Sequence, residues 1–140
     1  ENLHFIHGYI HMKNVMRSGN EPLLIDMDRI SRGHPIIELS DIYHFYVALG
    51  EEDPTVVERF MGFPYDTARR LFDTFLRRYL DTDDAARLAE VADKASLLCN
   101  SRKIRLIRKR GATSEGARRS IGRCLARIDE LTRRYGTLAF

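Results

Sequence analysis

The chain has 140 residues, 44% of them hydrophobic and 31% charged, and a formal net charge of +3. This composition is typical of a soluble globular domain with one hydrophobic core, and it excludes collagen-like, low-complexity and disordered chains. No run of residues reaches the ~18 apolar positions of a membrane span, and the first residues lack the pattern of a signal peptide. We therefore expect a cytoplasmic protein without membrane partners, in which Cys99 and Cys124 are reduced and buried.

Three short strands are predicted near the N-terminus, over residues 3–6, 15–17 and 23–26. The residues between the second and third strands, 18–22, contain Gly, Asn and Pro and are typical of a turn, so these two strands form a hairpin. The apolar third strand ends in a carboxylate, Asp26, which needs a polar partner there.

Asn14 and Asp26 are the candidate metal ligands. Asn14 directly precedes the second strand and Asp26 ends the third, so both lie at neighbouring strand ends. An amide oxygen and a carboxylate, completed by water and phosphate oxygens, are ligands that Mg²⁺ prefers. Asp28 lies two residues further on and has two interpretations, a further ligand or a cap of the turn that follows; the sequence leaves both open.

Helices are predicted over the remainder of the chain. The first begins at Pro35 and ends at Gly50, the second begins with the Asp53-Pro54 cap and stops at Gly62, and the third begins at Asp66. The third helix is expected to turn one apolar set inward, namely Leu71, Phe72, Phe75, Tyr79 and Leu80. A long helix follows Thr82-Asp83-Asp84 and runs to Arg110, and a last one runs from Ser114 to Gly136.

Two segments together resemble the aminoglycoside phosphotransferase and choline kinase family. Residues 7–14, His-Gly-Tyr-Ile-His-Met-Lys-Asn, are similar to its catalytic loop, His-Gly-Asp-x-His-x-x-Asn, and a strand ending in Ile-Asp follows. Residues 33–40, Gly-His-Pro-Ile-Ile-Glu-Leu-Ser, are similar to the family's Gly-Asp-Pro-x-x-Asp-Leu-Ala. The resemblance is specific over residues 4–49 and only architectural beyond them.

The resemblance implies a role for each matching residue. Asn14 and Asp26 would hold Mg²⁺ and the phosphates of ATP, while His7 and Glu38 would brace the catalytic loop. Tyr9 occupies the position of the catalytic aspartate, and a phenol with a pKa near ~10 accepts a hydroxyl proton poorly. His11, with a pKa near ~6.5, is an alternative base.

The expected fold is mostly α with a small β-hairpin (α+β), the carboxy-terminal lobe of a protein-kinase-like phosphotransferase. Residues 1–140 would form one domain, with the catalytic and metal-binding loops in 1–34 and a helical subdomain in 35–140. The glycine-rich loop, the strand lysine and the adenine hinge belong to an amino-terminal lobe, so this chain carries no cofactor-binding residues of that kind, and we expect a fragment of a longer protein. Its partners would be that lobe, a nucleotide and a small hydroxylated acceptor.

Three functions follow from the sequence. The first is an ATP- and Mg²⁺-dependent small-molecule phosphotransferase, impaired or inactive because of Tyr9; the second is a pseudokinase-type scaffold that binds a partner. The third and weakest rests on charge: residues 99–140 hold twelve Lys or Arg against three acids, or +9, whereas residues 1–98 hold eleven against seventeen, or −6. The basic segment 102–110 could bind a nucleic acid, but it lacks interleaved aromatics and has an acidic neighbour in the same chain.

A cationic acceptor of the phosphotransferase reaction could meet Asp41, Asp66 or Asp73. These aspartates equally suit a solvated helix face.

Overall fold

The computed structural model describes residues 3–140 and is mostly helical with short antiparallel strands, as the sequence predicted. Residues 1–2 of the predicted domain lie outside the described residues. The strands pair as two two-stranded sheets, β1 with β4 and β2 with β3. Their bounds are β1 His4–Ile6, β2 Val15–Ser18, β3 Glu21–Leu24 and β4 Ser31–Gly33.

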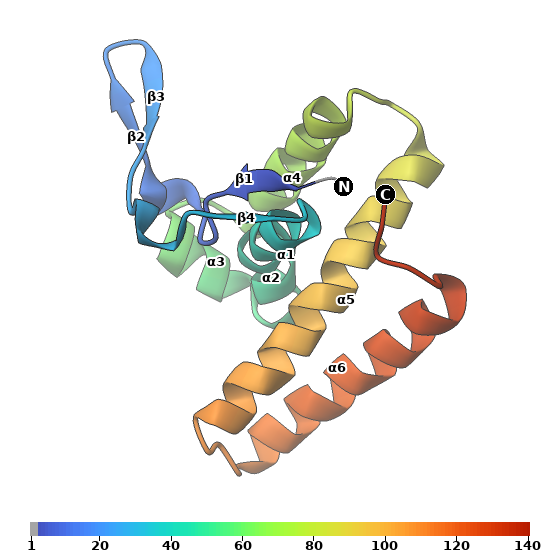
Figure 1. The fold of residues 1–140 in the computed structure, drawn as a ribbon. Helices are drawn as coiled ribbons and strands as arrows, with labels where there is room; N and C mark the ends of the chain where they lie inside the picture. The colour runs from blue at the N-terminus through green and yellow to red at the C-terminus, as the bar shows by residue number, and fades with distance from the viewer. Residues whose placement is uncertain (1–2) are drawn as a thin grey trace.

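The predicted hairpin is confirmed as β2–β3, which projects away from the helices in Figure 1. Val15 pairs with Leu24 and Ser18 with Glu21, so the turn is only Gly19-Asn20 and Pro22 belongs to the strand. The third strand therefore ends two residues before Asp26, whose φ of 62° is left-handed and incompatible with continued pairing. Strand β4 was not predicted, because three residues paired only with β1 carry little pattern of their own.

The helical part contains six α-helices and three short helical turns within the described residues. The helices are α1 Ile36–Tyr43, α2 Leu49–Glu52, α3 Pro54–Met61, α4 Tyr65–Leu80, α5 Ala85–Lys109 and α6 Glu115–Arg134. The turns are η1 Met12–Asn14, η2 Met27–Arg29 and the π-helical η3 His44–Ala48. Helices α5 and α6 form a long pair, and α5 also packs against α1 (Figure 1).

Side-chain caps are present at three helix starts, and the one at Asp53 was predicted. Asp53 accepts a hydrogen bond from the Thr55 amide, Asp84 from the Ala86 amide and Ser114 from the Ala117 amide. Each satisfies one of the backbone N–H groups that the first helical turn leaves unpaired.

The expected helix end at Gly50 is wrong. Helix α1 continues through η3 and α2 to Glu52, and Gly50 lies inside α2. A Cβ at position 50 would stand 2.1 Å from the Tyr65 ring, so this glycine permits close packing of α4 rather than a turn. Helix α4 likewise begins at Tyr65, one residue before the predicted Asp66.

The hydrophobic core lies between α1, η3, α4 and α5. Phe72 and Leu76 of α4 are buried in it, but Leu71 and Tyr79 are 40% and 45% exposed, so the expected inward set was too wide. The core side chains are Ile36, Leu39, Ile42, Tyr43, Val47, Phe72, Leu76, Leu88, Val91, Ala95 and Cys99. No helix among residues 3–140 is long and apolar enough to cross a membrane.

Candidate functional site

Asn14 and Asp26 meet at the base of the β2–β3 hairpin. Nδ2 of Asn14 donates to the Tyr9 carbonyl at 2.9 Å and to Oδ2 of Asp26 at 3.4 Å. Pairing of Val15 with Leu24, and the bond from the Ile25 amide to the Asn14 carbonyl, hold the two segments side by side. The hairpin thus brings Asn14 and Asp26 together although they are twelve residues apart in the sequence.

The contact between the two side chains joins the amide nitrogen of Asn14, not its oxygen, to the carboxylate of Asp26. Asn14 is buried and uses its amide hydrogens on Tyr9 and Asp26, which leaves its carbonyl oxygen as an acceptor. Only one carboxylate oxygen of Asp26 takes part in that contact. No group of three or more His, Cys, Asp or Glu gathers to hold a metal in residues 3–140, at this site or at any other, so Mg²⁺ here would need water and phosphate oxygens to complete its shell.

Glu38 and His7 hold the loop that carries Tyr9. The Gly8 amide donates to Oε2 of Glu38 at 3.0 Å, and Gly8 has the left-handed φ of 78°. Nε2 of His7 lies 2.9 Å from the Ile25 carbonyl, which ties the loop to the segment just before Asp26. The two side chains therefore connect residues 7–8 to the segment that follows β3 and to α1.

Tyr9 and His11 line different cavities. The Tyr9 ring has the Arg29 guanidinium 4.7 Å from its centroid and lines a cavity bounded by α1, η3 and α5. His11 is 5% exposed and packs edge-on against Tyr9, Phe45 and Phe60, on the side of a smaller apolar cavity. Burial and the nearby Lys13 lower the pKa of His11, so the imidazole is neutral.

Asp28 takes no part in this arrangement. It is exposed in the η2 turn and makes no hydrogen bond or ion pair with any residue in 3–140, neither with Asn14 nor as a cap of its own turn. Asp66 and Asp73 are exposed residues of α4, and neither lines the Tyr9 cavity. Asp41, by contrast, is buried and lines that cavity.

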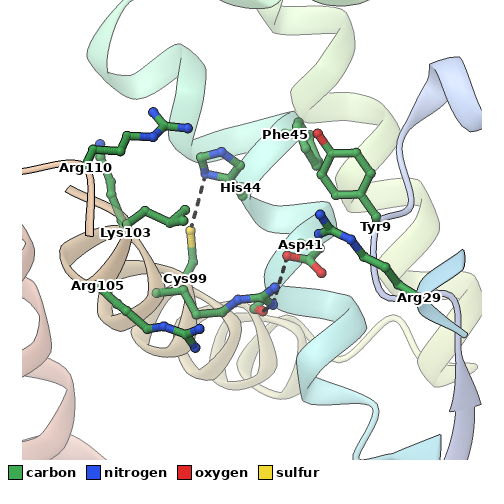
Figure 2. Close-up of a pocket in the computed structure, with 12 residues that line it drawn as sticks. Tyr9, Arg29, Asp41, His44, Phe45, Cys99, Lys103, Arg105 and Arg110 are labelled. Carbon is green, nitrogen blue, oxygen red and sulfur yellow. Dashed lines mark hydrogen bonds and ion pairs between the residues drawn. The ribbon is translucent and has the colours of Figure 1, made fainter. Parts of the chain in front are cut away.

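The cavity beside Tyr9 is the feature that the sequence did not reveal. Its volume is about 410 Å³, and Figure 2 shows side chains reaching it from Tyr9 and Arg29, from α1 and η3, and from α5. Five of its lining residues are Arg or Lys and one is acidic: Arg29, Arg102, Lys103, Arg105, Arg110 and Asp41. The basic segment 102–110 was visible in the sequence. Only the packing of α5 decides that some of its side chains share a cavity with residues between Tyr9 and Phe45.

His44 and Cys99 face each other in the wall of this cavity (Figure 2), with Nδ1 of His44 3.8 Å from Sγ of Cys99. Burial raises the pKa of the Cys99 thiol to about 12, and burial with the neighbouring Lys103 and Arg102 lowers the pKa of His44 to about 4. Both groups are therefore neutral near neutral pH. This is the reverse of the thiolate–imidazolium pair that a nucleophilic cysteine requires.

Comparison of the chain with protein-family models, with curated protein sequences and with solved structures gave no match. The resemblance to the phosphotransferase family therefore stays a prediction from residues 4–49.

Proposed function

We propose that the chain is the carboxy-terminal lobe of an ATP- and Mg²⁺-dependent small-molecule phosphotransferase, with weak or no transfer activity because Tyr9 replaces the base. The observation that carries this proposal is the contact of Asn14 with Asp26 at 3.4 Å, beneath a loop braced by Glu38. One amide oxygen and one carboxylate oxygen at neighbouring loop ends are the protein ligands that a magnesium nucleotide needs from this lobe. Magnesium, when bound, neutralises phosphate charge.

The residues of this chain have separate parts in the proposed activity. Asn14 and Asp26 position the metal-bound phosphates, while Gly8 and Glu38 fix the loop that faces the acceptor. Tyr9 lines the cavity where an acceptor hydroxyl would lie, but its phenol is a poor base. Because phosphoryl transfer depends mainly on positioning and charge, loss of the base costs ~10²–10⁴-fold in rate.

The proposed second lobe has a surface on which to pack. Large apolar side chains on β1, on the β2–β3 hairpin and in the segment before β4 are exposed, with Phe5 at 78%. The others are Leu3, Met12, Met16, Leu23, Leu24, Met27 and Ile30. Such a concentration of exposed apolar groups is unusual for a free surface and supports a protein partner there, which we propose is the amino-terminal lobe.

Nucleotide binding tests the proposal. Mg²⁺-ATP should raise the melting temperature of the full natural protein, because a ligand that binds only the folded state stabilises it. Asp26→Asn should abolish the Mg²⁺-dependent part of the shift, whereas Asp73→Asn, an exposed aspartate without an ion pair in residues 3–140, should leave it unchanged. Asp28→Asn in the same assay decides whether Asp28 is a third ligand. A Mg²⁺-dependent shift that survives Asp26→Asn contradicts the proposal.

The second candidate function is a pseudokinase-type scaffold, and Tyr9 is the observation that favours it. The Tyr9 ring packs against Phe45 and beneath Arg29, which makes it a structural element of the loop. Tyr9→Asp separates the two functions: an enzyme that has lost its base should gain ATP turnover, whereas turnover that stays at zero in a variant that still binds Mg²⁺-ATP favours the scaffold.

A further inference from the structure

The cavity beside Tyr9 carries a surplus of positive charge. Arg102 is paired with Asp41 at 2.9 Å, and Lys103 is paired with Glu52 at 2.6 Å. Arg29, Arg105 and Arg110 also line the cavity and form no ion pair within residues 3–140. Arg29 also lies near enough to Asp41 to oppose the rise that burial causes in its pKa, so the one carboxylate that lines the cavity is shared with Arg102, and the three arginines leave a net positive charge there.

The geometry of the cavity concentrates the field of these charges. Phe45 and Leu106 contribute apolar wall, and the neutral His44 and Cys99 add no charge. Low-dielectric walls around like charges raise the local concentration of counter-ions. A volume of about 410 Å³ lies within the range of small-molecule sites, about 300–1,000 Å³. The cavity is thus suited to a small anion rather than to a polymer on an open surface.

Asp41 supplies a second, different recognition group. Its side chain belongs to a residue that is 8% exposed, and Arg102 holds only Oδ1. Oδ2 is buried and has no hydrogen-bond partner. A buried acceptor of this kind is costly to leave unpaired, and a ligand hydroxyl would satisfy it once the Asp41 side chain turns toward the cavity.

We propose that this cavity binds a phosphate-bearing, hydroxylated small molecule, with its phosphate held by the combined positive charge of Arg29, Arg105 and Arg110 and a hydroxyl donating to Asp41. Arginine forks match phosphate oxygens bidentately, and a dianion offsets most of the surplus charge. Figure 2 shows Arg29 and the α5 side chains on opposite sides of the space beside Asp41. Because Tyr9 lines the same space, the ligand occupies the acceptor side of the loop. That it is the acceptor of phosphoryl transfer depends on the proposed function; that it binds does not.

The test is calorimetric titration of the 140-residue chain with glucose 6-phosphate, with inorganic phosphate and with glucose, in the absence of nucleotide and Mg²⁺. Both phosphates should bind and glucose should not. The double variant Arg105→Gln/Arg110→Gln should weaken phosphate binding about tenfold or more, since it removes two of the three unpaired positive charges that line the cavity. The matched control, Arg108→Gln/Lys109→Gln, removes the same charge from the same end of α5 outside the cavity and should change binding less than about threefold.

The outcomes separate binding in the cavity from general attraction. Absence of binding by either phosphate at millimolar concentrations would overturn the proposal, as would equal losses in the two double variants. Asp41→Ala, which removes the acceptor oxygens, should weaken glucose 6-phosphate relative to inorganic phosphate, and an equal effect on both would remove the hydroxyl contact. Binding of a DNA duplex that displaces glucose 6-phosphate and is weakened as much by Arg108→Gln/Lys109→Gln would favour a nucleic-acid surface instead.

The same variants keep this proposal distinct from the nucleotide site. Asp26→Asn should lose the Mg²⁺-ATP shift and keep phosphate binding, whereas Arg105→Gln/Arg110→Gln should do the reverse. An ATP shift that survives Asp26→Asn but is lost in the arginine variant would assign the triphosphate to the cavity. That result would refute the proposed function while leaving the anion site in place.

Discussion

Asp41 offers the sharpest quantitative prediction, because it is a carboxylate that the fold buries. Burial raises its pKa from the ordinary value of 3.8 to about 6, and the opposing effect of Arg102 is smaller. The contact with Arg102 at 2.9 Å would by itself lower the pKa, but it involves one oxygen and an arginine that is 38% exposed, whereas the other oxygen is buried without a partner. Desolvation therefore prevails.

The sign of the pH dependence follows from proton binding. Between about pH 4 and pH 6 the native state holds a proton on Asp41 that the unfolded chain has released, so the stability that this group contributes is lost as the pH rises through about 6. The difference between 3.8 and about 6 corresponds to about 3 kcal/mol at ~1.36 kcal/mol per pKa unit, as an upper figure. Asp41→Asn keeps the shape and the acceptor oxygen but never ionises.

Asp41→Asn should therefore leave stability nearly unchanged near pH 4 and raise the free energy of unfolding by about 2–3 kcal/mol at about pH 7.5. The measurement is urea denaturation of both proteins over this pH range. His44, whose pKa is lowered to about 4, titrates in the same window with the opposite sign, but it is common to both proteins and cancels in the difference. The exposed Asp73→Asn serves as control. A variant that is less stable at about pH 7.5, or a difference that does not change with pH, would refute the reasoning.

Two further substitutions test the packing and the loop. Gly50→Ala should lower the free energy of unfolding by about 1–3 kcal/mol, because its methyl would overlap the Tyr65 ring, whereas Gly122→Ala on α6, where no atom lies within 4 Å, should raise it by about 0.5–1 kcal/mol. Equal effects in urea denaturation would contradict the packing role of Gly50. Glu38→Ala should cost about 1–3 kcal/mol by leaving the Gly8 amide without its acceptor, and should speed hydrogen exchange at that amide. Unchanged exchange at Gly8 would show that Glu38 does not brace the loop.

Local chemistry made much of the fold predictable. The caps Asp53, Asp84 and Ser114 each accept a hydrogen bond from an amide two or three residues further along the chain. A short stretch of sequence is therefore enough to predict such a cap. The hairpin that joins Asn14 to Asp26 is similarly local, since its turn contains only Gly19 and Asn20. The contact at the candidate metal site is a consequence of that hairpin.

Contacts between distant segments were decided only by tertiary structure. Gly50 looks like a helix stop, but it lies within a helix because Tyr65 packs on it, and β4 exists only through its pairing with β1. The position of the basic residues of α5 likewise depends on the packing of α5 against α1. This packing buries Asp41, and it brings Arg105 and Arg110 to the cavity that Tyr9 and Arg29 also line. The burial and the pKa of Asp41, for example, depend on α5 and on Arg102, which is far from Asp41 along the chain. The sequence alone therefore determined which chemical groups were present and which helices and hairpin carried them, while packing decided which of those groups share a site.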